Sequence, residues 1–133
     1  MRKFVDRFEK AVNSSPIVLS SHIEKHFGPT GFSLYLKGSL RFIDSTVLEF
    51  ALFGNDSARG VIVDKYRFQY MSTNGYMIFR YDNAPHHPDI PSFPHHKHTS
   101  GDVIPASMPA ITDLLNEISA IILRSGPDPN NPK

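Results

Sequence analysis

The chain of 133 residues contains no cysteine and no tryptophan. Without cysteine it can form neither a disulfide framework nor a thiolate nucleophile, and this composition suits a reducing compartment. No apolar run approaches the roughly 20 residues that a transmembrane helix needs, and an amphipathic stretch follows Met1 where a signal peptide would have an apolar core. The formal net charge is only +1, so any attraction to nucleic acid must come from a local patch. We expect a soluble cytoplasmic protein with no membrane contact.

What the sequence does contain is a hydrophobic periodicity that changes from helical to alternating and back. Apolar residues at helical spacing predict an amphipathic helix before Pro16, where proline ends it. A second helix is predicted from about Ser107, a plausible N-cap, to Ser125. Alternating segments predict strands at residues 17–27, 31–42, 45–53, 60–72 and 76–82. The fold class is therefore α+β: an antiparallel meander of about five strands with both helices on one face, in a single domain of residues 1–125. Residues 126–133 are predicted to be a flexible, proline-rich tail.

Two details of the predicted sheet can be checked in a structure. In residues 31–42, the alternation assigns Phe32, Leu34, Leu36, Leu40 and Phe42 to the buried face. Asn74-Gly75 indicates a two-residue β-turn between the last two strands. The predicted cross-strand pairs are Phe68 with Tyr81, Tyr70 with Phe79, Arg67 with Asp82, Gln69 with Arg80, and Met71 with Ile78. Such neighbours lie about 5 Å apart, so we expect a polar cluster in which Asp82 pairs with Arg67.

Residues 79–98 hold five of the seven histidines and repeat the sequence Pro-His-His. Proline recurs at every third position from Pro85 to Pro94, which favours an extended polyproline II arm rising about 3.1 Å per residue. One interpretation is a metal site, since imidazole is a common ligand for zinc, copper and nickel. An extended arm would hold the two motifs far apart, however, so we expect no metal site and no cofactor.

Two other interpretations of the histidines remain open. Histidine can accept and return a proton near neutral pH, and arginine stabilises anionic phosphate; metal-independent RNA cleavage requires this combination. Alternatively, the arm is structural and covers the sheet edge, with Ile90 and Phe93 packed on the core. A non-catalytic module that binds RNA or a partner, or a histidine-rich protein that binds divalent metal, is the alternative to an enzyme.

The motif sequences also resemble a known family. Residues 79–87 (FRYDNAPHH) and 93–98 (FPHHKH), with residues 66–70 upstream, resemble the TumE-type toxins of prokaryotic toxin–antitoxin systems. The resemblance implies a toxin neutralised by a DNA-binding, helix-turn-helix antitoxin, and RNA cleavage is the common activity of such modules. We therefore expect a ribonuclease with an RNA substrate, and a homodimer is compatible with this role. The candidate catalytic residues are Arg80, Asp82, His86, His87, His96 and His98. The candidate substrate-binding residues are Arg67, Tyr81 and Lys97.

Overall fold

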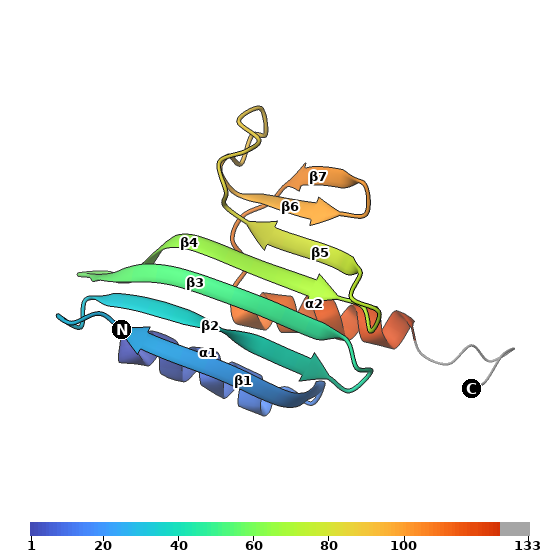
Figure 1. Cartoon of the computed structure of the whole chain (residues 1–133), viewed down its shortest axis with the longest axis horizontal. Coiled ribbons are helices and arrows are strands. Elements are labelled where there is room, and N and C mark those ends of the chain that lie inside the picture. Colours follow the sequence, from blue (N-terminus) through green and yellow to red (C-terminus); the bar gives the residue numbers. More distant parts are fainter. Residues whose placement is uncertain (126–133) are drawn as a thin grey trace, which may run out of the picture.

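The computed structural model describes residues 1–125, which form one antiparallel sheet with two helices on one of its faces (Figure 1). The tail predicted at 126–133 lies outside the described residues. The helices are α1 (Arg2–Ser14) and α2 (Ile111–Arg124). The strands are β1 (Val18–Phe27), β2 (Ser33–Phe42), β3 (Val47–Ser57), β4 (Gly60–Met71), β5 (Met77–Asp82), β6 (His96–Thr99) and β7 (Asp102–Pro105). The predicted α+β class is confirmed.

The strands follow one another across the sheet in chain order, and every neighbouring pair is antiparallel. The expected meander is therefore confirmed, with seven strands instead of about five. The two additional strands, β6 and β7, follow the segment from Pro85 to Pro94 that was predicted to be an extended arm. Each has only four residues, which is too short for an alternating pattern to stand out in the sequence.

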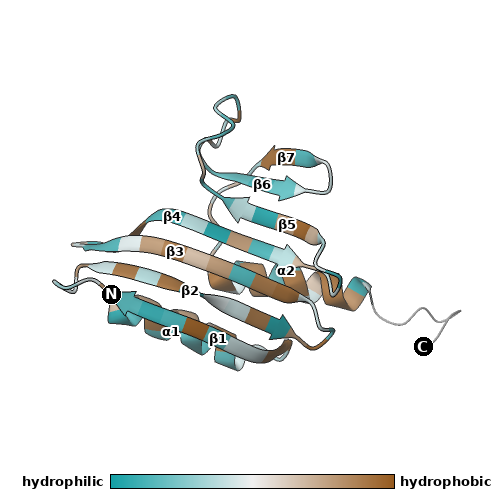
Figure 2. Ribbon diagram, in the orientation of Figure 1, coloured by the Kyte–Doolittle hydropathy of each residue, from teal (hydrophilic) through white to brown (hydrophobic). Residues whose placement is uncertain are grey.

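Alternation along the strands builds the core between the sheet and the helices. The face of the sheet that the helices cover, here called the inner face, carries the hydrophobic core, and the opposite face is called the outer face. The largest fully buried side chains include Tyr70, Phe42, Phe68, Leu34, Leu36, Leu40, Leu48, Leu114, Ile118 and Val12. The predicted burial of Phe32 is wrong: Phe32 is 65% exposed and lies just before β2, which begins at Ser33. Figure 2 shows hydrophilic colours on β6 and on the loop that precedes it.

The hairpin of β4 and β5 has the predicted register over most of its length. Arg67 is opposite Asp82 and Gln69 is opposite Arg80, while Phe68 and Phe79 are buried. The register shifts at Met71, which is opposite Met77 and not Ile78. The reason is a longer turn, in which the backbone of Ser72 bonds that of Tyr76 and Gly75 adopts a φ of 83°. Three-residue hairpin loops commonly use a glycine in this left-handed conformation.

Helix α2 starts later than its predicted cap at Ser107. Ala110 is the N-cap, with extended backbone angles, and its N–H donates to the Asp113 carboxylate at 3.1 Å. The preceding segment is held elsewhere, because the Ala106 N–H donates to the Ser92 hydroxyl at 3.1 Å. Neither helix within residues 1–125 is long and apolar enough to cross a membrane.

Candidate functional site

Strand β6 brings the second Pro-His-His motif back beside the hairpin. In its pairing with β5, Arg80 is opposite His98, Tyr81 is opposite Lys97, and Asp82 is opposite His96. Successive side chains of a strand point to opposite faces, so Arg80, Asp82, His96 and His98 share the outer face. With His87 from the first motif, these five residues are called the outer cluster below.

A buried carboxylate organises the outer cluster. Asp82 is 5% exposed, and its Oδ1 accepts the backbone N–H of Ala84 at 2.9 Å and lies 3.0 Å from Nε2 of His96. Its Oδ2 accepts from Nε of Arg80 at 2.9 Å. The predicted ion pair with Arg67 is wrong: Arg67 is the cross-strand neighbour of Asp82, but the carboxylate is fully engaged by Arg80, His96 and Ala84. Arg67 is exposed on the same face.

The hydrogen bonds of His96 define which of its nitrogens carry protons. Nδ1 lies 2.9 Å from the carbonyl oxygen of Pro94, which can only accept, so Nδ1 is a donor. Nε2 faces the Asp82 carboxylate, which as an ionised group also accepts only. His96 is 2% exposed, so both of these contacts are shielded from solvent.

His98 has the opposite hydrogen-bonding role. The guanidinium of Arg80 donates from Nη2 to Nε2 of His98 at 3.2 Å. Nε2 of His96 lies 3.1 Å from the same His98 nitrogen. A guanidinium can only donate, so the single lone pair of Nε2 of His98 accepts from Arg80 and the ring is neutral. The same nitrogen lies 3.4 Å from Oδ2 of Asp82. Burial, followed by the positive charge of Arg80, lowers the pKa of His98 below its ordinary value.

The first motif contributes His87, because the arm is folded and not extended. Polyproline II has no internal hydrogen bonds, whereas here Ile90 N–H donates to the His87 carbonyl at 3.2 Å and Phe93 N–H donates to the Ile90 carbonyl at 2.9 Å. The His87 ring centroid lies 5.1 Å from that of His96 and 5.8 Å from that of His98. One ligand nitrogen from each of the three rings lies within 4.8 Å of the others. The reasoning from which we expected no metal site is therefore wrong.

The structure does not bring Tyr81 and Lys97 to the outer cluster. Both lie on the inner face, where Glu117 of α2 accepts from the Tyr81 hydroxyl at 2.7 Å and from Nζ of Lys97 at 2.6 Å. Nζ of Lys97 also lies over the ring of Phe79 at 5.0 Å. Hydrogen bonds to Glu117 and Tyr81 raise the pKa of Lys97 although burial opposes this. These hydrogen bonds connect β5 and β6 to α2.

His86 separates from its neighbour His87 and lines a hollow beside the cluster. It is exposed, and the hollow of about 520 Å³ also contacts Lys65, Asn83 and Phe93. Phe93 is 44% exposed, and neither Phe93 nor Ile90 belongs to the buried core. The idea that these two residues pack the arm on the core is therefore wrong.

Sequence reasoning missed two residues that support the cluster. Tyr66 stacks on His95, with ring planes 18° apart and the hydroxyl 3.0 Å from Nδ1, and burial raises the pKa of Tyr66 well above its usual value. Asn83 accepts the Tyr66 backbone N–H at 3.0 Å and donates to the Asp64 carbonyl at 2.9 Å. Asn83 directly follows Asp82, so its place in the motif was an available signal.

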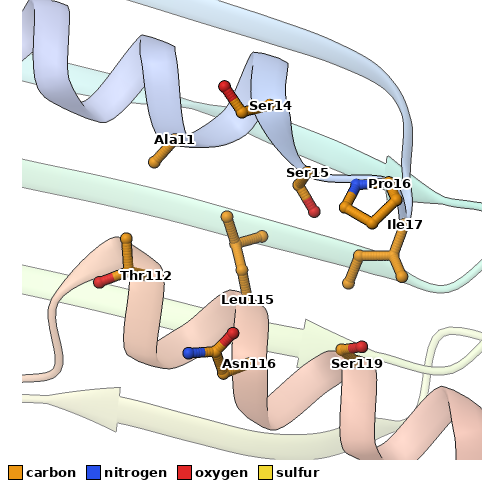
Figure 3. Close-up of a pocket in the computed structure, with 9 residues that line it drawn as sticks. All are labelled: Ala11, Ser14, Ser15, Pro16, Ile17, Thr112, Leu115, Asn116 and Ser119. Carbon is orange, nitrogen blue, oxygen red and sulfur yellow. The ribbon is translucent and has the colours of Figure 1, made fainter.

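A second hollow lies between the end of α1 and helix α2, as Figure 3 shows. Its volume is about 320 Å³. The lining residues are Ala11, Ser14, Ser15, Pro16, Ile17, Thr112, Leu115, Asn116 and Ser119. None of these side chains titrates near neutral pH or carries a charge. The outer cluster, not this hollow, has the groups that acid–base or ligand chemistry requires.

A family comparison agrees with the sequences that build the cluster. Residues 8–124 match the family model described as Toxin TumE, which covers most of the chain. The chain therefore belongs to the Toxin TumE family, the predicted resemblance is confirmed, and the role of the protein is that of a toxin. A toxin of this kind implies an antitoxin partner. No curated protein and no solved structure gives a significant match.

Proposed function

We propose that the protein is the toxin of a type II toxin–antitoxin module and acts in the cytoplasm as a small, metal-independent ribonuclease. The observation that carries the proposal is that two neighbouring histidines of the outer cluster differ in hydrogen bonding, one as an acceptor and the other as a donor. Nε2 of His98 accepts a hydrogen bond from the partly exposed Arg80, so its lone pair is available to a substrate once Arg80 turns to a phosphate, whereas Nδ1 of His96 beside it donates to the Pro94 carbonyl. Acid–base cleavage requires groups whose surroundings favour different protonation states.

The charge of the outer cluster suits a phosphate. Arg80 and Arg67 carry two positive charges on this face against the single negative charge of Asp82, so the surface attracts an anion. The Arg80 side chain is 32% exposed, which leaves part of its guanidinium open to a ligand. Exposed Arg67 on the adjacent strand extends this positive surface along the path of an RNA backbone.

In the proposed reaction, Arg80 moves from Nε2 of His98 to the phosphate, and Nε2 then removes the proton from a ribose 2′-hydroxyl. The 2′-oxygen attacks the adjacent phosphorus, the bond from phosphorus to the 5′-oxygen breaks, and His87 donates a proton to that leaving oxygen. Arg80 stabilises the negative charge that develops on the phosphate. His96 is too buried to touch the substrate, so it acts as a positioning residue together with Asp82.

The hollow lined by His86 and Phe93 gives a place for a nucleobase beside the reacting phosphate. An exposed aromatic ring stacks on bases of single-stranded RNA, and the amide of Asn83 lies at the same hollow. Tyr81 and Lys97 are not assigned a substrate contact, because both are committed to Glu117 on the inner face.

The test is cleavage of a defined RNA by purified protein, with analysis of the product ends. The expected products carry a 2′,3′-cyclic phosphate and a 5′-hydroxyl, and an RNA with a 2′-deoxyribose at the cleaved position resists cleavage. A helix-turn-helix antitoxin made from the neighbouring gene should suppress the activity. RNA binding without any cleavage would contradict the proposal and support the non-catalytic alternative. The predicted homodimer is checked by light scattering on the same preparation.

A further inference from the structure

The contacts between His96 and its neighbours place several hydrogen-bond acceptors around one point. Nδ1 of His96 holds its proton against the Pro94 carbonyl, so the neutral ring has only a lone pair on Nε2. That lone pair lies 3.0 Å from a carboxylate oxygen of Asp82 and 3.1 Å from the acceptor nitrogen of His98. These atoms form a compact group of nitrogen and oxygen donors, which is an arrangement that can hold a metal ion.

The side chains around this point are the ligands that late transition metals prefer. His87, His96 and His98 each offer one nitrogen, and these nitrogens lie within 4.8 Å of one another. Neutral imidazole suits zinc, nickel and copper(II), whereas magnesium and calcium prefer oxygen ligands. The hydrogen bond from Nδ1 of His96 to the Pro94 carbonyl is the outer contact that orients metal-binding histidines in general.

We propose that His87, His96 and His98 form a binding site for one divalent transition-metal ion of the zinc, nickel or copper(II) class, and that metal binding inhibits the toxin. The inhibitory part rests on the proposed function, but the binding site does not. A bound ion occupies the lone pairs of His87 and His98, which are the nitrogens that exchange protons with RNA in the proposed reaction.

Arg80 is the natural competitor of the metal. Its Nη2 donates to the same His98 lone pair at 3.2 Å, and its positive charge opposes a second cation nearby. Because the Arg80 side chain is partly exposed, it can leave His98 when a metal enters. Removal of its charge should therefore strengthen metal binding while it abolishes stabilisation of the phosphate.

The binding test uses full-length protein that has been treated with EDTA, dialysed and titrated with zinc chloride in a calorimeter. We expect one zinc ion per chain. Loss of an outer hydrogen-bond partner already weakens metal sites by about 10–100-fold, so His87→Ala and His98→Ala should each weaken binding by at least about tenfold. Arg80→Gln should bind zinc as tightly as the wild type or more tightly. His22→Ala removes an exposed histidine on the distant strand β1 and should leave the affinity unchanged.

Every outcome of the zinc titration either supports or contradicts the proposed metal site. No zinc binding, or an affinity that His22→Ala reduces as much as His87→Ala does, contradicts it and indicates surface histidines. Circular dichroism excludes unfolding of the variants, and His87 and His98 are chosen because neither is fully buried. Zinc bound with the expected variant pattern by a protein that cleaves no RNA would keep the metal site and reject the ribonuclease. Cleavage that zinc leaves unchanged at saturation would reject the inhibition.

Discussion

The two Pro-His-His motifs are identical in sequence but lie in different structural settings. In the first, Pro85-His86-His87, the chain has left β5 and runs through turns, so His86 is exposed and only His87 reaches the outer cluster. In the second, Pro94-His95-His96, the chain enters β6, so His96 is 2% exposed beside Asp82 while His95 stacks on Tyr66. The difference shows that strand pairing, not the motif itself, decides which histidine is buried and held by hydrogen bonds.

Tertiary pairing also gives the histidines of the two motifs different hydrogen-bond partners. The second motif supplies a histidine with two fixed hydrogen bonds, to Pro94 and Asp82. The first supplies His87, which lies on a loop and has no comparable pair of bonds in the described structure. We infer that the second motif builds the site and the first completes it. The predictions below test this division of roles.

Replacement of His96 should have the largest effect on stability. His96→Ala removes the hydrogen bond to the buried Asp82 carboxylate and leaves a cavity, which costs about 1–3 kcal/mol of unfolding free energy. The corresponding replacement in the first motif, His87→Ala, should change that free energy by less than about 0.5 kcal/mol. Urea unfolding followed by circular dichroism measures both. Equal losses in the two variants would show that the motifs are structurally equivalent.

A smaller loss of unfolding free energy is expected when Tyr66, which contacts His95 of the second motif, is changed. Tyr66→Phe keeps the ring that stacks on His95 but removes the hydroxyl, and one such hydrogen bond contributes about 1 kcal/mol. Tyr76→Phe is the matched control, because Tyr76 is 73% exposed and should show no change. A loss of the same size in both variants would mean that the Tyr66 hydroxyl does not hold the second motif in place.

Much of the fold could be predicted because its long strands alternate clearly. Residues such as Leu34, Phe68 and Phe79 have the two-residue period that places a side chain on the buried face. The predicted pairing of Arg67 with Asp82 is observed because the register shift between Tyr70 and Met71 offsets the longer turn. The turn itself was predicted one residue too short, since Asn74-Gly75 occurs in both two-residue and three-residue loops.

The site was harder to predict because it depends on a pairing that short segments do not reveal. Proline spacing correctly marks an unusual segment, but local propensity alone favoured an extended arm. The i to i+3 hydrogen bonds after His87 and the pairing of His96 with Asp82 override that propensity. Alternation within β6 then explains why Lys97, between two cluster histidines, faces Glu117 on the other side of the sheet.

In the function that we propose, the outer cluster is the active centre and works by proton transfer without a metal. The most direct measurement is the single-turnover rate of RNA cleavage in EDTA for the wild type, His98→Ala and the remote control His22→Ala. General acid–base catalysis typically contributes about 10²–10⁴-fold, so His98→Ala should lose at least about 100-fold while the wild type and His22→Ala stay equally active. The proposed mechanism is contradicted if the wild type loses cleavage in EDTA and regains it with one equivalent of a divalent ion. Full activity in folded His98→Ala would also contradict it.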